Sequence, residues 1–135
     1  MKKRLLFING HLNTGGVEKA LLDVLRHIDY ERYEVDLLLL EELGDYAMQL
    51  PPQVNVLLRN LKNTYGSLPK CLLRCLAQSD WFSLRMRLIF LRMKFFGQRR
   101  IAAAERLLLG GKAYDCVIGF RPGICTQIAA FACKA

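Results

Sequence analysis

The stretch INGHLNTGGVEKALLDVLRHI, residues 8–28, decides how this chain folds. An apolar segment at residues 3–9 runs straight into a loop that contains Gly10, Gly15 and Gly16. After the glycine pair, apolar residues recur at the three- and four-residue spacing of a helix with one buried face. The stretch therefore predicts a strand, a glycine loop and an amphipathic helix that follow one another without a linker.

The rest of the chain continues the alternation of strands and helices. The remaining strands are expected at residues 33–40, 54–58 and 114–120, and the remaining helices at residues 66–96, 99–111 and 124–135. The first of these helical segments is expected to break near AQSD, residues 77–80, where Ser79 or Asp80 is suited to cap a new helix. Gly110 or Gly111 is expected to end the next helix.

Strands that alternate with helices predict a parallel sheet joined by right-handed crossovers. The continuous apolar run at residues 37–40 supports this prediction, because it suits a strand that is covered on both faces. We predict an α/β fold, Rossmann-like, with strand order 3-2-1-4 and helices on both faces. The chain stops within the last expected helix and offers no fifth strand, so we interpret residues 1–135 as one domain of a truncated fold.

Composition narrows the class of protein. A chain of 135 residues with 53% hydrophobic residues is large enough to bury one core. The apolar run at the N-terminus is too short for a secretory signal, and no run reaches the roughly 18 residues of a membrane span. The five cysteines form no CxxC pair and only two histidines accompany them, so we expect reduced, mostly buried thiols, no metal site and a cytoplasmic protein.

The glycine loop has the character of an anion-binding site. Backbone N–H groups at a helix N-terminus are unpaired, and glycine lets a phosphate approach them closely. The spacing of Gly10, Gly15 and Gly16 matches neither GxGxxG nor the P-loop pattern. Glu41 and Glu42 end the second strand at the place of a ribose-binding acid, so a dinucleotide cofactor is not excluded as a ligand. The alternative is that the glycines form only a tight turn.

Four polar residues are expected near this loop, in a crevice flanked by the first and fourth strand ends. His11 is a candidate to hydrogen-bond a sugar or to act as a base, although a lone loop histidine is usually solvated. Asn13 and Thr14 are candidates both for ligand contacts and for helix caps. Arg121 follows the fourth strand and is suited to bind a phosphate or an acidic acceptor, unless it simply faces solvent.

Two segments carry a resemblance to a known family. FINGHLNTGGVEKALLDVLRHIDYERYEVDLLLL and YDCVIGFRPGICTQIAAFA resemble the N-terminal domain of family-four glycosyltransferases of the GT-B fold. In that family the first strand leads into a Gly-Gly-x-Glu loop and helix, here Gly15 to Glu18. The resemblance covers about residues 3–57 and 113–133.

The resemblance implies a retaining transferase that needs no metal or cofactor and takes its sugar from a nucleotide-sugar donor. Its N-terminal half holds a glycan or lipid-linked acceptor and offers Gly15 and Gly16 to the donor's diphosphate. The C-terminal half, with the nucleotide pocket, would lie outside these residues, so the chain alone is expected to be inactive. The rival hypothesis is a stand-alone Rossmann-like module that binds a nucleotide or a membrane without catalysis.

The basic charge is confined to the middle of the chain. Residues 59–100 contain ten lysines and arginines and one acid, Asp80. The segment at residues 80–100 places apolar side chains on two helical sectors, with basic residues between them. One sector is free to contact an anionic membrane surface, at the inner face of the membrane. The expected contact residues are Trp81, Phe82, Arg85, Arg92, Lys94 and Phe96. Alternatively, both sectors are buried and the basic stems reach solvent; no nucleic-acid motif accompanies the charge.

Overall fold

The computed structural model describes residues 1–61, 64, 67–96 and 108–132. The chain forms two compact units, and each is described by itself. The first unit contains Met1–Arg59 and Ala113–Ala135, and the second contains Asn60–Lys112. Both segments that carry the family resemblance lie in the first unit.

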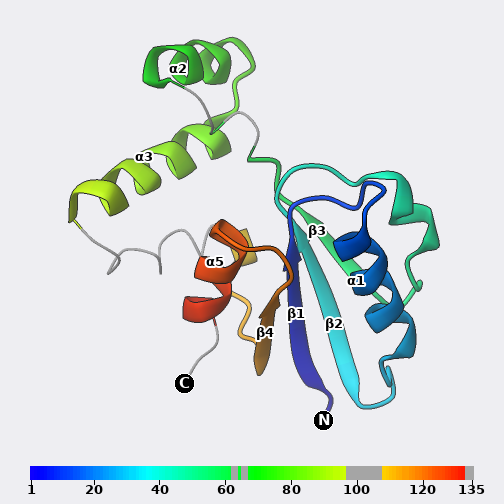
Figure 1. The fold of residues 1–135 in the computed structure, drawn as a ribbon. Coiled ribbons are helices and arrows are strands. Elements are labelled where there is room, and N and C mark those ends of the chain that lie inside the picture. The colour runs from blue at the N-terminus through cyan, green and yellow to red at the C-terminus, as the bar shows by residue number, and fades with distance from the viewer. Residues whose placement is uncertain (62–63, 65–66, 97–107, 133–135) are drawn as a thin grey trace. The chain divides into compact units, whose positions relative to one another are not determined.

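The first unit is built on a four-stranded parallel sheet (Figure 1). Its strands are β1 (Lys3–Asn9), β2 (Tyr33–Leu39), β3 (Asn55–Leu58) and β4 (Cys116–Gly119). The strand order is β3-β2-β1-β4 and every pairing is parallel, so the predicted fold class and order are confirmed. The helices of this unit are α1 (Gly16–His27), α5 (Ile124–Ala132) and the short 3-10 helix η1 (Asp45–Gln49).

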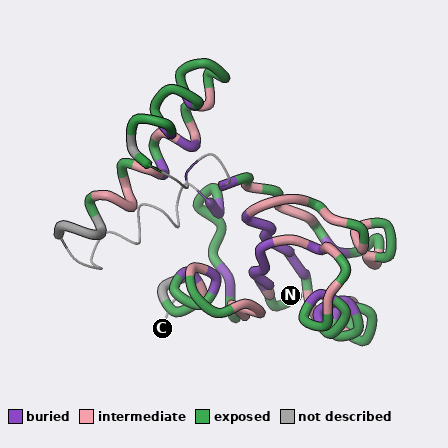
Figure 2. The backbone as a smooth tube through the Cα atoms, turned by 45° about the horizontal axis from the view of Figure 1, so that its top comes forward, coloured by how far each residue is buried: buried purple, intermediate pink, exposed green. Residues whose placement is uncertain are grey.

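Helix α1 covers one face of the sheet. Its buried residues Leu21 and Leu25 belong to a cluster of side chains from alternate positions of the strands. These strand residues are Phe7, Val35, Leu37 and Leu39, with Val54 just before β3. Residues between them in β1 and β2 are also buried, because alternate side chains of a strand point to opposite faces. The continuous apolar run in β2 is therefore covered on both sides, as predicted (Figure 2).

Helix α5 covers the opposite face. Ile118 of β4 packs against the cluster under α1, so the next residue, Gly119, faces away from it. A Cβ at Gly119 would stand 2.9 Å from the carbonyl oxygen of Cys125 in α5. The backbone of α5 therefore lies directly on that face of β4. Helices on both faces of the sheet were predicted, and this geometry confirms them.

The second unit contains helices α2 (Leu68–Ala77) and α3 (Trp81–Phe96). The break between them falls where AQSD predicted it. Asp80 provides the cap, since its carboxylate accepts hydrogen bonds from the backbone N–H of Ser83 (3.1 Å) and from its hydroxyl (2.6 Å). Residues 108–109 are helical, and Gly110 and Gly111 follow with left-handed φ values of 62° and 80°. The earlier part of that predicted helix falls on residues 97–107, outside the described residues.

Candidate functional site

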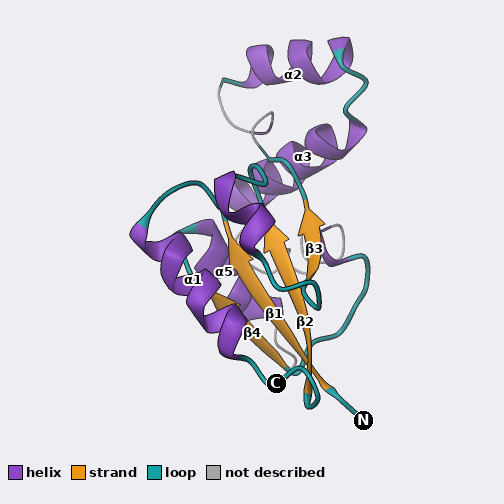
Figure 3. Cartoon of the chain, turned by 90° about the vertical axis from the view of Figure 1, so that its right-hand side faces the viewer, coloured by secondary structure: helices purple, strands orange, loops and turns teal. Residues whose placement is uncertain are grey.

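The loops that follow β1, β2 and β4 meet at the carboxyl edge of the sheet, which the arrowheads of the strands mark in Figure 3. The backbone N–H of Glu41 donates to the carbonyl of Gly10 (2.8 Å), which joins the first two loops. The N–H of Phe120 donates to the carbonyl of Ile8 (2.9 Å), which joins the loop after β4 to β1. The topology thus brings together the first and fourth loops, as the sequence predicts for this fold.

The glycine pair opens helix α1. Gly15 is the N-cap residue, in an extended conformation with φ −173° and ψ 164°. Gly16 is the first helical residue, and apart from its chain neighbours and the backbone of its own helix no described heavy atom lies within 4 Å of where its Cβ would stand. The described glycines with a left-handed φ are Gly44, Gly110, Gly111 and Gly123. Gly16 is not among them, so a left-handed backbone conformation does not require glycine there.

Glu18 already places a negative charge at the start of α1. Its side chain is buried, and its carboxylate fills the space beside Gly15 where a Cβ would stand. A carboxylate in the first helical turn is stabilised by the unpaired N–H groups and by the helix dipole. A phosphate at this helix must therefore bind on the open side, over Gly16, and not beneath the loop.

His11 is held by the loop itself. The Nδ1 atom accepts a hydrogen bond from the backbone N–H of Asn13 (3.3 Å), and it lies 3.7 Å from Oε1 of Glu18. The carbonyl of His11 accepts a hydrogen bond from the buried side-chain amide of Asn9 (2.8 Å). A neutral imidazole that accepts at Nδ1 carries its proton on Nε2. Nδ1 thus faces the loop N–H and the Glu18 carboxylate, so both roles predicted for His11, hydrogen bonding to a sugar and action as a base, would use Nε2.

Asn13 and Thr14 connect the first loop to the second. The amide of Asn13 donates to Oε1 of Glu42 (2.6 Å), and the hydroxyl of Thr14 donates to Oδ2 of Asp45 (3.3 Å). Since Gly15 is the N-cap of α1, the alternative that either residue caps this helix is wrong. The acids after β2 attract these side chains away from the helix end. No local pattern in the sequence indicates that Glu42 and Asp45 are the partners of Asn13 and Thr14.

Arg121 lies over the end of β1. A Cβ at Gly10 would stand 2.8 Å from Nη1 of Arg121 and 3.2 Å from Oε1 of Glu41. The same two side-chain atoms are 3.8 Å apart and form an ion pair across the edge. Glu41, which the sequence offered as a ribose-binding acid, is therefore the partner of Arg121. The absence of a side chain at Gly10 makes room for this pair, a role that the spacing of the glycines did not indicate.

Cys125, in the first turn of α5, lies near the same ion pair. Burial raises the pKa of the Cys125 thiol to about 11; the guanidinium of Arg121 lowers this pKa and the carboxylate of Glu41 raises it, both by smaller amounts. The thiol is thus protonated at neutral pH. Cys125 therefore does not supply a nucleophile to the site.

The edge as a whole is more acidic than basic. Its charged side chains are Glu18, Glu41, Glu42, Asp45 and Arg121. Carboxylates accept hydrogen bonds from hydroxyl groups and repel a free anion. The carboxylates therefore offer acceptors for the hydroxyl groups of a ligand, beside the start of α1 at Gly16. Within the described part of the chain, no group of three or more His, Cys, Asp or Glu residues is placed to hold a metal ion.

The expected membrane-contact residues lie in the second unit, on α3. Trp81, Arg85 and Arg92 are exposed, and Phe82 is partly buried. Lys94 and Phe96 belong to the helix, but their side chains lie outside the described part of the structure.

Comparisons of the chain with protein-family models, with curated proteins and with solved structures found no match. The function of the site therefore rests on its geometry.

Proposed function

We propose that this chain is the acceptor-side half of a retaining glycosyltransferase of the GT-B fold. It would act with a nucleotide-sugar donor on a glycan or a membrane-associated, lipid-linked acceptor. The parallel sheet with order β3-β2-β1-β4 is the fold that this proposal requires. The resemblance of residues 3–57 and 113–133 to family-four glycosyltransferases supplies the reaction class.

The observation that carries the proposal is the open space at Gly16. Gly16 begins α1 at the carboxyl edge of the sheet, where ligands of this fold class bind. Apart from its chain neighbours and the backbone of its own helix, no described atom lies within 4 Å of its Cβ position, and its φ does not demand glycine. A glycine that neither packing nor φ requires is explained by a ligand that approaches the backbone. A donor diphosphate is such a ligand, and the helix dipole favours it.

The surrounding side chains suit an acceptor that carries hydroxyl groups. The Nε2–H of His11 is suited to donate to a sugar oxygen. The carboxylates of Glu41 and Glu42 are suited to accept from sugar hydroxyls, and each also holds a protein side chain in place. Arg121 would bind an acidic group of the acceptor once that group competes with Glu41. No residue of this edge is assigned as the catalytic base.

Isotope-edited NMR of the purified chain tests this proposal. Inorganic diphosphate and a panel of nucleotide sugars are titrated against the labelled chain. The proposal predicts shifts of the backbone amides from Gly15 to Glu18. Shifts confined to other parts of the chain would contradict it.

An activity assay separates the proposal from its rival. A preorganised site needs groups from both sides of its cleft, and this chain provides one side. The purified chain is therefore expected to transfer no sugar from any donor in the panel. Sugar transfer by the purified chain would refute the proposal that the active site is divided between two halves of the enzyme. Tight binding of a nucleotide without any effect of a glycan acceptor would favour a non-catalytic binding module.

A further inference from the structure

Several large apolar side chains are exposed in the part of the second unit that the structure describes. Helix α2 buries Cys71 and Cys75, one turn apart, while Leu72, Leu73 and Leu76 are exposed. The exposed fraction of Leu73 is 69%. Contiguous exposed apolar residues on a helix mark an interaction site.

Helix α3 adds an exposed face in which apolar and basic residues alternate. Trp81 and Leu88 are 66% and 49% exposed. Arg85, which lies between them in the sequence, and Arg92, which follows Leu88, are exposed as well. Positions separated by four, seven and eleven residues lie on one side of a helix. The buried residue Met86 points about half a turn away from Leu88, toward the interior of the unit. The exposed stripe is therefore the outer face of α3.

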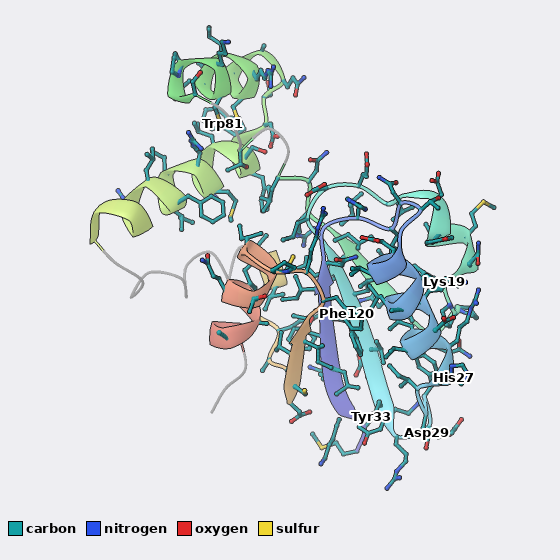
Figure 4. All side chains as sticks on the ribbon, viewed as in Figure 1. Lys19, His27, Asp29, Tyr33, Trp81 and Phe120 are labelled. Atoms are coloured by element: carbon teal, nitrogen blue, oxygen red, sulfur yellow. The ribbon has the colours of Figure 1, made fainter. Side chains whose placement is uncertain are left out.

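The two exposed faces meet at the turn between the helices. Leu76 and Trp81 line the same small cavity of about 30 Å³, together with Cys75 and Leu84. Figure 4 labels Trp81 at the start of α3, beside α2. The leucines of α2 are thus continuous with Trp81, and we name this surface the leucine–tryptophan patch. It consists of Leu72, Leu73, Leu76, Trp81 and Leu88.

The charge around the patch indicates what covers it. The segment of residues 59–100 has ten basic residues, and its one acid, Asp80, is engaged as the cap of α3. Exposed basic residues lie beside the leucines of α2 (Lys70 and Arg74) and alternate with the apolar residues on the outer face of α3 (Arg85 and Arg92). In the described residues, no helix is long and apolar enough to cross a bilayer. An apolar patch with adjoining basic residues matches a surface that is anionic outside and apolar beneath.

We propose that the leucine–tryptophan patch docks on an anionic lipid bilayer. The leucines and Trp81 enter the region between headgroups and acyl chains, and the basic residues bind the lipid phosphates. This interaction is independent of the reaction proposed for the edge of the sheet. It moves the expected membrane contact from α3 alone to α2 and α3 together, with Leu72, Leu73 and Leu76 as added contact residues.

Tryptophan fluorescence reports on this patch alone, because Trp81 is the only tryptophan of the chain. The experiment mixes the intact chain with phosphatidylcholine vesicles, with and without phosphatidylglycerol, and records co-sedimentation and tryptophan emission. The proposal predicts sedimentation with the anionic vesicles, a blue shift of Trp81 emission, and weaker binding as salt rises.

Two variants separate the apolar and basic parts of the surface. Leu73→Asp is expected to reduce binding at least about tenfold and to diminish the blue shift, because it places a charge in the inserted face. Arg85→Glu with Arg92→Glu is expected to reduce binding to anionic vesicles at least about 25-fold, at roughly fivefold for each basic residue removed. Val24→Asp and Arg26→Glu, on the exposed side of α1, are the matched controls and should leave binding unchanged.

Circular dichroism confirms that each variant is folded. Equal binding to neutral and anionic vesicles, or no binding to either, would overturn the proposal. So would unchanged Trp81 emission on vesicles to which the chain binds. Self-association that Leu73→Asp abolishes, without vesicle binding, would identify the patch as a protein interface and would also overturn it.

Discussion

Replacing Gly16 by valine separates a binding role of the glycine loop from a folding role. Gly16 is the first residue of α1, it has no left-handed φ, and apart from its chain neighbours and the backbone of its own helix no described atom lies within 4 Å of its Cβ position. A valine side chain therefore fits without strain. The same side chain would occupy the space through which a phosphate approaches the backbone.

The expected effects on folding and on binding differ in size. Glycine costs a helix about 1 kcal/mol relative to alanine, and valine costs less. Gly16→Val should therefore leave the free energy of unfolding unchanged or raise it by up to about 0.5 kcal/mol. A charge-assisted hydrogen bond from the loop to a phosphate is worth about 1.5–3 kcal/mol. Loss of these bonds should weaken diphosphate binding at least about a hundredfold, or about 2.7 kcal/mol.

The assay is the NMR titration with inorganic diphosphate and nucleotide sugars, accompanied by thermal unfolding of each variant. Ala20→Val is the matched control, because Ala20 is an exposed residue one turn further along α1. The control should bind as the unmodified chain does. If folded Gly16→Val binds diphosphate with unchanged affinity, the glycine does not exist to admit a phosphate, and the reasoning is refuted.

Four further predictions concern other residues of the chain. Gly119→Ala should destabilise the fold by about 1–3 kcal/mol in urea unfolding, because its Cβ meets the backbone carbonyl of Cys125 at 2.9 Å. Gly10→Ala should cost less than about 1 kcal/mol, because the atom it meets at 2.8 Å belongs to the flexible side chain of Arg121; equal losses for the two variants would contradict this ranking. Asp80→Ala should cost about 1 kcal/mol through loss of the cap of α3, and no change in stability would contradict the cap. The rate of alkylation of Cys125 should be low at neutral pH and should rise about tenfold per pH unit toward the thiol's pKa of about 11. Rapid labelling of the folded chain at pH 7 would show that this thiol is neither buried nor neutral.

The fold was predictable because its signals are local and repeated. The apolar segments fixed the four strands, and the helical spacing after Gly16 fixed α1. Rules of connectivity then gave the strand order, since a right-handed crossover leaves few arrangements of four parallel strands. The break at Asp80 was equally local, because a capping residue acts on the N–H groups of the turn that follows it.

The contacts within the site were less predictable because they join loops that are distant in sequence. Asn13 was predicted either to cap the helix or to contact a ligand, but its side chain donates to Glu42, 29 residues away. Arg121 was placed at the correct edge by topology, yet its ion pair with Glu41 depends on side-chain packing over Gly10. Residue spacing predicts which side chains are neighbours within one helix or strand. It does not predict which of several acidic residues in another loop a loop side chain will bind.

The distribution of charge assigns attraction to an anionic membrane and recognition of a sugar to different segments of this chain. Residues 1–58, which form most of the candidate edge, carry nine acids and six basic residues, whereas residues 59–100 carry ten basic residues and one acid. Attraction to an anionic surface grows with each basic residue near it, so the second segment suffices for membrane affinity. Hydroxyl recognition needs fixed acceptors, which the carboxylates of the edge provide. Under this division, removing charge from Arg85 and Arg92 should weaken membrane binding without changing how the edge binds a sugar, and substitutions at the edge should have the reverse effect.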